Sequence, residues 1–100
     1  MLKPNRIKNK ALLKSFYSKK CTACPKIGSD PAHIKTVGSG GNDTEENLIP
    51  LCREHHSEQH SIGIATFALK YSTVEDYLNR HGWEIINVFG VNRIRRQLGK

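Results

Sequence analysis

The sequence predicts a small α+β domain in which a zinc knuckle and two short strands precede a helix, and further helices follow. Three observations predict this fold class. Two Cys/His pairs have the spacing of zinc ligands. Two short apolar segments flank a glycine-rich stretch, as strands flank a loop. The segment 52–60 contains neither Gly nor Pro and is rich in Glu and Gln, which favours a helix.

The size of the chain limits how far a hydrophobic core can stabilise it. A chain of 100 residues normally forms one domain, and a domain of this length buries a limited share of its unfolded surface. Only 37% of the residues are hydrophobic, and 7% are aromatic. We therefore expect a bound metal to contribute to the stability of the fold.

Positive charge is concentrated at the two ends of the chain, and the formal net charge is +7. Residues 1–20 contain seven Lys or Arg, residues 91–100 contain four, and neither segment contains an acid. Residues 21–90 contain five basic and nine acidic residues, which gives 5 − 9 = −4. This pattern fits ends that bind a polyanion and a middle that binds cations, while solvated basic tails are the plainer alternative.

The cysteine count and the hydropathy pattern indicate the cellular compartment in which we expect this protein. Three cysteines cannot all pair within one chain. No apolar segment follows the basic N-terminus as in a signal peptide, and none approaches the roughly 18 residues of a membrane span. We therefore expect a cytoplasmic protein without a membrane partner, in which clustered Cys and His bind metal.

The N-terminal half is expected to consist of an arm, a knuckle and two strands. Residues 1–20 form a basic arm that is flexible over 1–10 and a short helix or an extended piece over 11–18. Cys, Pro, Gly, Ser and Asp punctuate the knuckle and its turn. The expected ranges are 21–31 for the knuckle, 32–37 for the first strand, 38–47 for the loop and 48–51 for the second strand.

Three helices are expected after the second strand. The first covers 52–60, and apolar residues at helical spacing predict another over 62–71. Ser72 or Thr73 is expected to cap the third helix, which Gly82 ends.

The C-terminal segment is expected to complete the domain. Residues 83–88 fit a strand or a helix, and 91–98 is expected to be a basic helix. Residues 21–100 would then be a single domain with a C-terminal helical extension. His81 is expected to be a surface or capping residue. The aromatic side chains expected in the core are Phe67, Tyr71, Tyr77 and Trp83.

Two ligand pairs predict a zinc site. Cys21 and Cys24 form one pair, and Cys52 and His55 form the other. Zinc prefers thiolate and imidazole at four corners, and two intervening residues let one turn present both members of a pair. The alternative, two unrelated Cys pieces and a surface His, leaves the three cysteines without a common role. Four protein ligands leave zinc no open position, so its expected role is structural.

A second polar group remains after these ligands are assigned: Asp30, His33, Asn47, His56 and His60. His56 and His60 are four residues apart on the expected helix, so both imidazoles lie on one face and can share a cation. A two-stranded hairpin folded over that helix would bring His33 across from His56. The sequence therefore predicts a second, histidine-rich site.

The stretch CTACPKIGSDPAHIKTVGSGGNDTEENLIPLCREHHSEQH resembles the motif of the HNH endonucleases, whose core is the ββα-metal fold. The resemblance rests on AHI at 32–34, the Gly pair at 40–41, NLIPLC at 47–52 and the HH-x3-H run at 55–60, and it covers residues 17–71. It is similar in particular to the phage and prophage subgroup of small recombination-associated or uncharacterised nucleases. The resemblance implies DNA as substrate, and a catalytic divalent cation such as Mg²⁺ or Mn²⁺ besides the structural Zn²⁺.

The resemblance also implies a role for each matching residue. His33 matches the general base that takes a proton from water, a task suited to imidazole near neutral pH. Asn47 matches the residue that fixes the loop or the base histidine by hydrogen bonds. His56 matches a catalytic residue that binds the cation, and His60 matches a further ligand found in some members. Many members have a ligating His or Asp directly before the base, where this chain has Ala32.

Asp30 is the nearest candidate for the ligand missing at Ala32. On a regular strand residues i and i+3 face opposite sides, so Asp30 can reach the cation only if Pro31 bends the chain. The alternative is that Asp30 caps a turn, a common use of Asp beside Pro. Both readings stay open at the level of sequence.

Basic residues near the motif and at the C-terminus are candidates for binding the nucleic acid. These are Lys35, Arg53, Arg93, Arg95 and Arg96. A rival hypothesis is a zinc-knuckle DNA-binding module without catalysis. Such a module needs only four zinc ligands, so three further histidines favour the nuclease.

Overall fold

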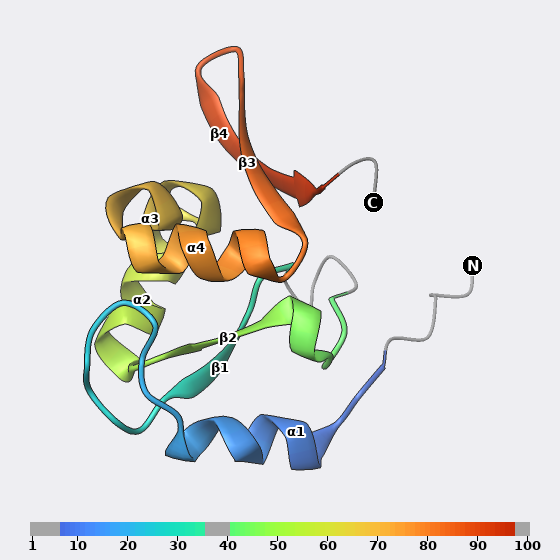
Figure 1. Cartoon of the computed structure of the whole chain (residues 1–100), viewed down its shortest axis with the longest axis vertical. Coiled ribbons are helices and arrows are strands. Elements are labelled where there is room, and N and C mark those ends of the chain that lie inside the picture. The colour runs from blue at the N-terminus through green and yellow to red at the C-terminus, as the bar shows by residue number, and fades with distance from the viewer. Residues whose placement is uncertain (1–6, 36–40, 98–100) are drawn as a thin grey trace.

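The computed structural model describes residues 7–35 and 41–97. Within these ranges it contains four α-helices, two antiparallel strand pairs and short 3₁₀ turns at Phe16–Ser18 and Glu45–Asn47 (Figure 1). The elements are α1 (Lys10–Ser15), β1 (Asp30–His33), β2 (Leu48–Leu51), α2 (Arg53–Ile62), α3 (Ile64–Lys70), α4 (Ser72–Arg80), β3 (Trp83–Val88) and β4 (Val91–Arg96). The mixed α+β class predicted from the sequence is therefore correct.

The pair β1–β2 carries the motif residues. Its register places Asp30 opposite Leu51 and His33 opposite Leu48. All four residues of β2 are buried, which explains why this strand is a continuous apolar run rather than an alternating one. The helix α2 begins at Arg53, directly after Cys52, so the strand pair and the histidines of α2 are held close together.

The hydrophobic core lies between the β1–β2 pair and the helices α3 and α4. Burial is complete or nearly so for Ala32, Ile49, Leu51, Phe67, Ala68, Val74, Leu78 and Trp83. The core positions expected for Phe67 and Trp83 are confirmed. Tyr71 and Tyr77 are half-buried and pack against this cluster. No helix in the described part of the chain is long and apolar enough to cross a bilayer.

The helices follow the sequence expectations with shifted ends. Gly63, with φ of 86°, separates α2 from α3. The helix α4 begins at Ser72 with Tyr71 as its N-cap, so the expected cap at Ser72 or Thr73 is wrong. Thr73 instead donates its hydroxyl to the carbonyl oxygen of Thr22, at 2.7 Å, which ties α4 to the knuckle. His81 is the C-cap of α4, as expected.

The expected basic helix over 91–98 is wrong for the residues described, because this segment forms β4 and pairs with β3. Phe89 and Gly90 both have positive φ, 51° and 80°, which is the geometry of a tight turn between two strands. The hairpin projects from the body of the molecule (Figure 1). The C-terminal extension is thus two helices followed by a β-hairpin, and β3 settles the open choice at 83–88. Residue 98 lies outside the described part.

The expected flexible arm also differs from the structure where it is described. The backbone of Ile7 exchanges hydrogen bonds with segment 41–47: its carbonyl accepts from Asp43 N at 2.8 Å, and its N–H donates to Asn42 Oδ1 at 2.7 Å. Of the two options left open at 11–18, a short helix or an extended piece, the structure has the helical one, as α1 and the 3₁₀ turn. The remaining expectations for 1–6, 36–37 and 38–40 fall outside the described residues.

Candidate functional site

The structure brings together the four side chains predicted as zinc ligands. The ligand atoms of Cys21, Cys24, Cys52 and His55 all lie within 4.8 Å of one another. The Sγ atoms of Cys24 and Cys52 are 3.9 Å apart, and His55 Nδ1 lies 3.2 Å from Cys52 Sγ. Thiolates about 2.3 Å from a tetrahedral zinc lie about 3.8 Å apart, so these residues fit the ion. Among the described residues this is the one such cluster with three or more members.

The ligands come from two local structures that the zinc would join. The knuckle is a tight turn in which Cys21 N–H donates to Lys26 O at 2.9 Å. Cys52 is the N-cap residue of α2, and His55 lies one turn further along that helix. Burial raises the pKa of the Cys21 thiol, whereas a hydrogen bond from the backbone N–H of Lys26 lowers the pKa of Cys24. Zinc would replace the protons on these thiols.

A second imidazole group lies on the same helix. His56 and His60 face each other, with 3.1 Å between their Nε2 atoms. The other ring nitrogen of His56, Nδ1, lies 3.2 Å from Asp30 Oδ2 at the start of β1. The helical spacing of four residues accounts for the first contact, and the β1–α2 packing for the second. The two Nε2 atoms therefore lie side by side on one face of α2.

Asp30 contacts the far edge of the His56 ring. Its carboxylate also accepts a hydrogen bond from Arg53 Nε at 3.0 Å. Burial alone would raise the pKa of Asp30, but the hydrogen bonds from His56 and Arg53 outweigh it and hold this pKa below its usual value. The carboxylate therefore stays ionised and can accept a hydrogen bond from the Nδ1–H group of His56.

His33 lies at the other end of β1 and contacts a residue that sequence reasoning missed. Its Nε2 is 2.8 Å from Oδ1 of Asp43, whose side chain is only 4% exposed. The second oxygen of Asp43 accepts from the backbone N–H of Asn9 at 2.9 Å. It is Asp30, rather than His33, that hydrogen-bonds to His56. The one sequence signal for Asp43 is a carboxylate inside the glycine-rich loop expected over 38–47, two residues after Gly41.

Asn47 holds the segment between the strands. Its side-chain oxygen accepts from Lys35 N at 2.7 Å, and its amide donates to Lys35 O at 3.1 Å and to Asn42 O at 2.9 Å. The residue is 5% exposed. Asn47 thus ties the residue after Ile34 to the segment that carries Asp43.

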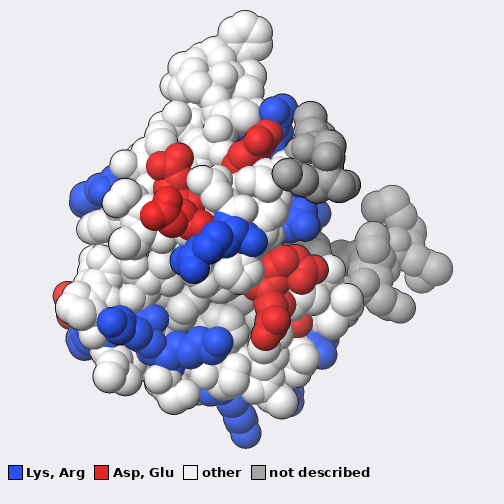
Figure 2. Space-filling view, in the orientation of Figure 1, with Lys and Arg blue, Asp and Glu red and all other residues white. Residues whose placement is uncertain are grey.

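The five basic candidates are distributed rather than clustered. Lys35 follows β1, Arg53 starts α2, and the other three lie on β4. Arg95 forms an ion pair with Glu84, and Arg96 lies over the Trp83 ring with 4.9 Å between Cζ and the ring centroid. On the face seen in Figure 2, basic side chains form separate groups with acidic ones between them, and the tip of the hairpin is uncharged.

Fold and site define a small α+β domain with a Cys₃His cluster and a second group of histidines. Residues 5–84 match a family model described as "Putative HNHc nuclease", so the chain belongs to this HNHc family. The family is described as one of nucleases.

A curated relative extends the comparison. The chain is 38% identical over 56 residues to "Uncharacterized protein YdfU" of Escherichia coli (strain K12). The match covers 53% of this chain and 16% of the relative, so the chain spans a small part of that protein. No solved structure matches the chain.

Proposed function

We propose that this protein is an endonuclease that hydrolyses DNA phosphodiester bonds with His33 as general base, one divalent cation at His56 and His60, and a structural zinc at the Cys₃His cluster. The observation that carries the proposal is the contact between His33 Nε2 and the buried Asp43 carboxylate. A histidine held in this way has one ring nitrogen committed and the other available for chemistry. β1, β2 and α2 would form the ββα-metal core.

The proposed base works through the nitrogen that Asp43 does not contact. A carboxylate accepts hydrogen bonds, so the proton of neutral His33 is assigned to Nε2, and Nδ1 keeps its lone pair. Nδ1 then takes a proton from the attacking water, and Asp43 stabilises the imidazolium that forms. Asn47 supports this step by holding the segment that carries Asp43.

The proposed cation site uses the imidazole pair. Nitrogens about 2.0–2.1 Å from one metal ion lie roughly 3.0–3.4 Å apart, and the two Nε2 atoms are 3.1 Å apart. A bound cation would neutralise charge that gathers on the phosphate oxygens during hydrolysis. Imidazole ligands suit Ni²⁺, Fe²⁺ or Zn²⁺ better than Mg²⁺, with Mn²⁺ between them.

Asp30 is assigned as the residue that orients His56. A ligating histidine commonly donates its second N–H to a carboxylate, and the contact from His56 Nδ1 to Asp30 Oδ2 has this form. The contact supports a role for Asp30 in place of the ligand missing at Ala32, in which Asp30 would act on the cation through His56. Arg53 then steadies Asp30 and is available to a nearby phosphate.

Plasmid nicking tests the proposal. Zinc-loaded protein is incubated with supercoiled DNA and Mn²⁺, Ni²⁺ or Mg²⁺, and the open-circular product is measured against a sample without an added cation. We expect nicking that depends on the added cation. Protein that binds the plasmid but never nicks it with any of these cations would be a DNA-binding module instead.

The phage or prophage subgroup and a cytoplasmic location stay predictions.

The variant Asp43→Asn tests how the base is held. The asparagine oxygen can still accept from Asn9 N–H, while its amide donates to His33 Nε2 and moves the imidazole proton to Nδ1. We expect kcat to fall about 10–100-fold with KM little changed. Two-dimensional ¹⁵N spectra of the imidazole should report the exchanged tautomer. Asp76→Asn, on the exposed surface of α4, is the control. An unchanged tautomer with normal kcat removes Asp43 from the mechanism.

The variant Asp30→Asn tests the cation site. Loss of the charged acceptor leaves His56 poorly oriented, so the Mn²⁺ concentration for half-maximal nicking should rise about 10–100-fold. Saturating Mn²⁺ should restore most of the rate. The matched control is Glu54→Gln, an exposed acid near the start of α2. Equal metal dependence in the wild type and Asp30→Asn would show that Asp30 does not act on the cation.

A further inference from the structure

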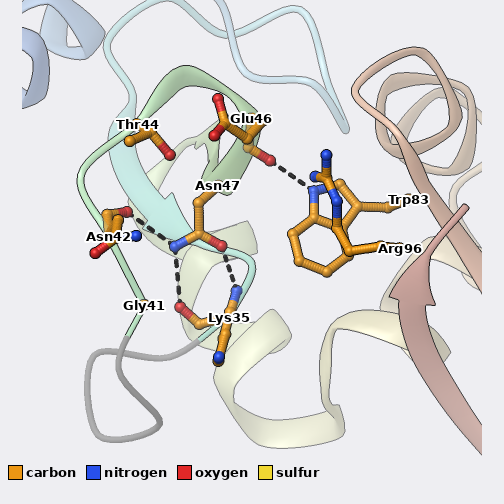
Figure 3. A pocket seen from close by; sticks show the side chains of 8 residues that line it. All are labelled: Lys35, Gly41, Asn42, Thr44, Glu46, Asn47, Trp83 and Arg96. Atoms are coloured by element: carbon orange, nitrogen blue, oxygen red, sulfur yellow. Dashed lines mark hydrogen bonds between the residues drawn. The ribbon is translucent and has the colours of Figure 1, made fainter. Parts of the chain in front are cut away.

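A pocket of about 340 Å³ lies between segment 41–47 and the base of the β3–β4 hairpin. In Figure 3, Asn47 and Lys35 form one side of this space, and Trp83 and Arg96 form the other. The described residues that line it are Lys35, Gly41, Asn42, Thr44, Glu46, Asn47, Trp83 and Arg96. None of the roles proposed above uses this space.

Both walls of the pocket are held by contacts within the protein. Asn47 fixes the backbone of Lys35 and Asn42 on one side. On the other, Trp83 Nε1 donates to the carbonyl oxygen of Glu46 at 2.6 Å, which joins the hairpin to segment 41–47. Because these anchors involve only protein groups, the pocket exists before any ligand binds.

Arg96 is positioned above the Trp83 ring by two features. Its guanidinium lies 4.9 Å from the ring centroid, and Nη1 donates to His81 O at 3.4 Å. A Cβ at Gly82 would lie 3.2 Å from Nη2, so glycine at this position leaves room for the guanidinium. A guanidinium stacked on an aromatic ring still has N–H groups directed outward in its plane, the arrangement that suits phosphate.

The pocket and the proposed base share one segment of chain. Asn42 and Thr44 line the pocket, whereas Asp43, between them, hydrogen-bonds to His33. Neighbouring side chains of an extended segment point to opposite sides, and Thr44 has extended φ and ψ of −131° and 156°. A ligand in the pocket would therefore lie against the other side of the segment that holds His33.

We propose that this pocket binds a backbone phosphate of the DNA strand beside the phosphate that is cut, between Lys35 and Arg96. The proposal rests on the proposed function and extends it to substrate positioning. Lys35 and Arg96 provide two positive charges against the one negative charge of Glu46. Thr44, which also lines the pocket, adds a hydroxyl that can donate a hydrogen bond to such a phosphate.

Kinetics of Arg96→Ala test the site. We expect KM for DNA to rise about tenfold with kcat nearly unchanged, since a charge-assisted contact is lost. The slope of log affinity against log salt should fall by about 0.9. Arg80→Ala, another exposed arginine outside the pocket, is the matched control. If Arg96→Ala and Arg80→Ala both nick with wild-type KM and salt slope, the phosphate site is wrong while the nuclease stands.

A binding measurement gives an answer that does not depend on nicking. Trp83 is the only tryptophan of the chain, so its fluorescence reports on this pocket. A short oligodeoxynucleotide is titrated into the zinc-loaded protein. Chelators are omitted so that the zinc stays bound, and no catalytic cation is added so that the DNA is not cut. We expect a saturable change that Lys35→Ala weakens, with inorganic phosphate producing a smaller change. No fluorescence change, or the same titration curve for Lys35→Ala and the wild type, overturns the proposal.

Discussion

Replacing His33 with Ala is expected to lower the nicking rate by about 10²–10⁴-fold, the range for loss of a general base. The side chain is 19% exposed and lies at the end of β1, so its removal should leave the buried core intact. Zinc content and affinity for DNA should therefore stay at wild-type values. The expected loss falls on kcat, because His33 acts on the attacking water rather than on the bound strand.

Two controls make this result specific. His81→Ala removes a histidine that stacks on Tyr77 at the end of α4, and should nick normally. Added imidazole should restore part of the rate in His33→Ala, since it can occupy the vacated space beside Asp43 and take the same proton. A His33→Ala protein that nicks at the wild-type rate would exclude His33 as the base, and the motif would then need another proton acceptor.

The zinc cluster could be predicted from the sequence because its geometry is almost entirely local. Two residues between Cys21 and Cys24 fit one tight turn, and the same spacing between Cys52 and His55 fits the first turn of a helix. The facing imidazoles of His56 and His60 follow from helical spacing in the same way. The contacts that join these local units could not be predicted in this way.

Asp43 could not be found because its role depends on how a loop folds back on a strand. The pairing with His33 spans ten residues of sequence and is supported by Asn9, from a segment expected to be flexible. Neither contact leaves a periodic pattern in the sequence. Asp30 was found as a candidate, but only the packing of β1 against α2 places it at His56 Nδ1.

The hairpin was missed because its turn lacks the usual residues. Asn-Gly or Asp-Gly commonly marks such a turn, and here the pair is Phe89-Gly90. The spacing of the arginines in β4 also fits the exposed face of a basic helix, which is why a helix was expected. In the structure Ile94 instead lies opposite Ile85 in the antiparallel β3–β4 pair. Because of that error the pocket could not be predicted, since Trp83 and Arg96 lie opposite each other only when β3 and β4 pair as a hairpin.

Removal of the structural zinc is expected to have the largest effect on stability. The cluster joins the knuckle to the start of α2, and Cys21 and Cys52 also belong to the hydrophobic core. Structural zinc contributes about 10–16 kcal/mol in zinc-finger peptides, and small domains have a net stability of about 5–15 kcal/mol. Without zinc, the protein should therefore lose most of its cooperative thermal transition.

Cys24→Ser tests this expectation at the most exposed of the three thiols. We expect less than one zinc per chain by elemental analysis and a large loss of helical circular dichroism. All three cysteines belong to the cluster, so the control is His60→Ala. That variant should lose cation-dependent nicking while keeping its zinc and its melting temperature. A Cys24→Ser protein that kept its zinc and its melting temperature would contradict the structural role of the cluster. A His60→Ala protein that lost its zinc and its melting temperature would show that the two groups of ligands are not independent metal sites. Either result would end the division between a structural and a catalytic ion.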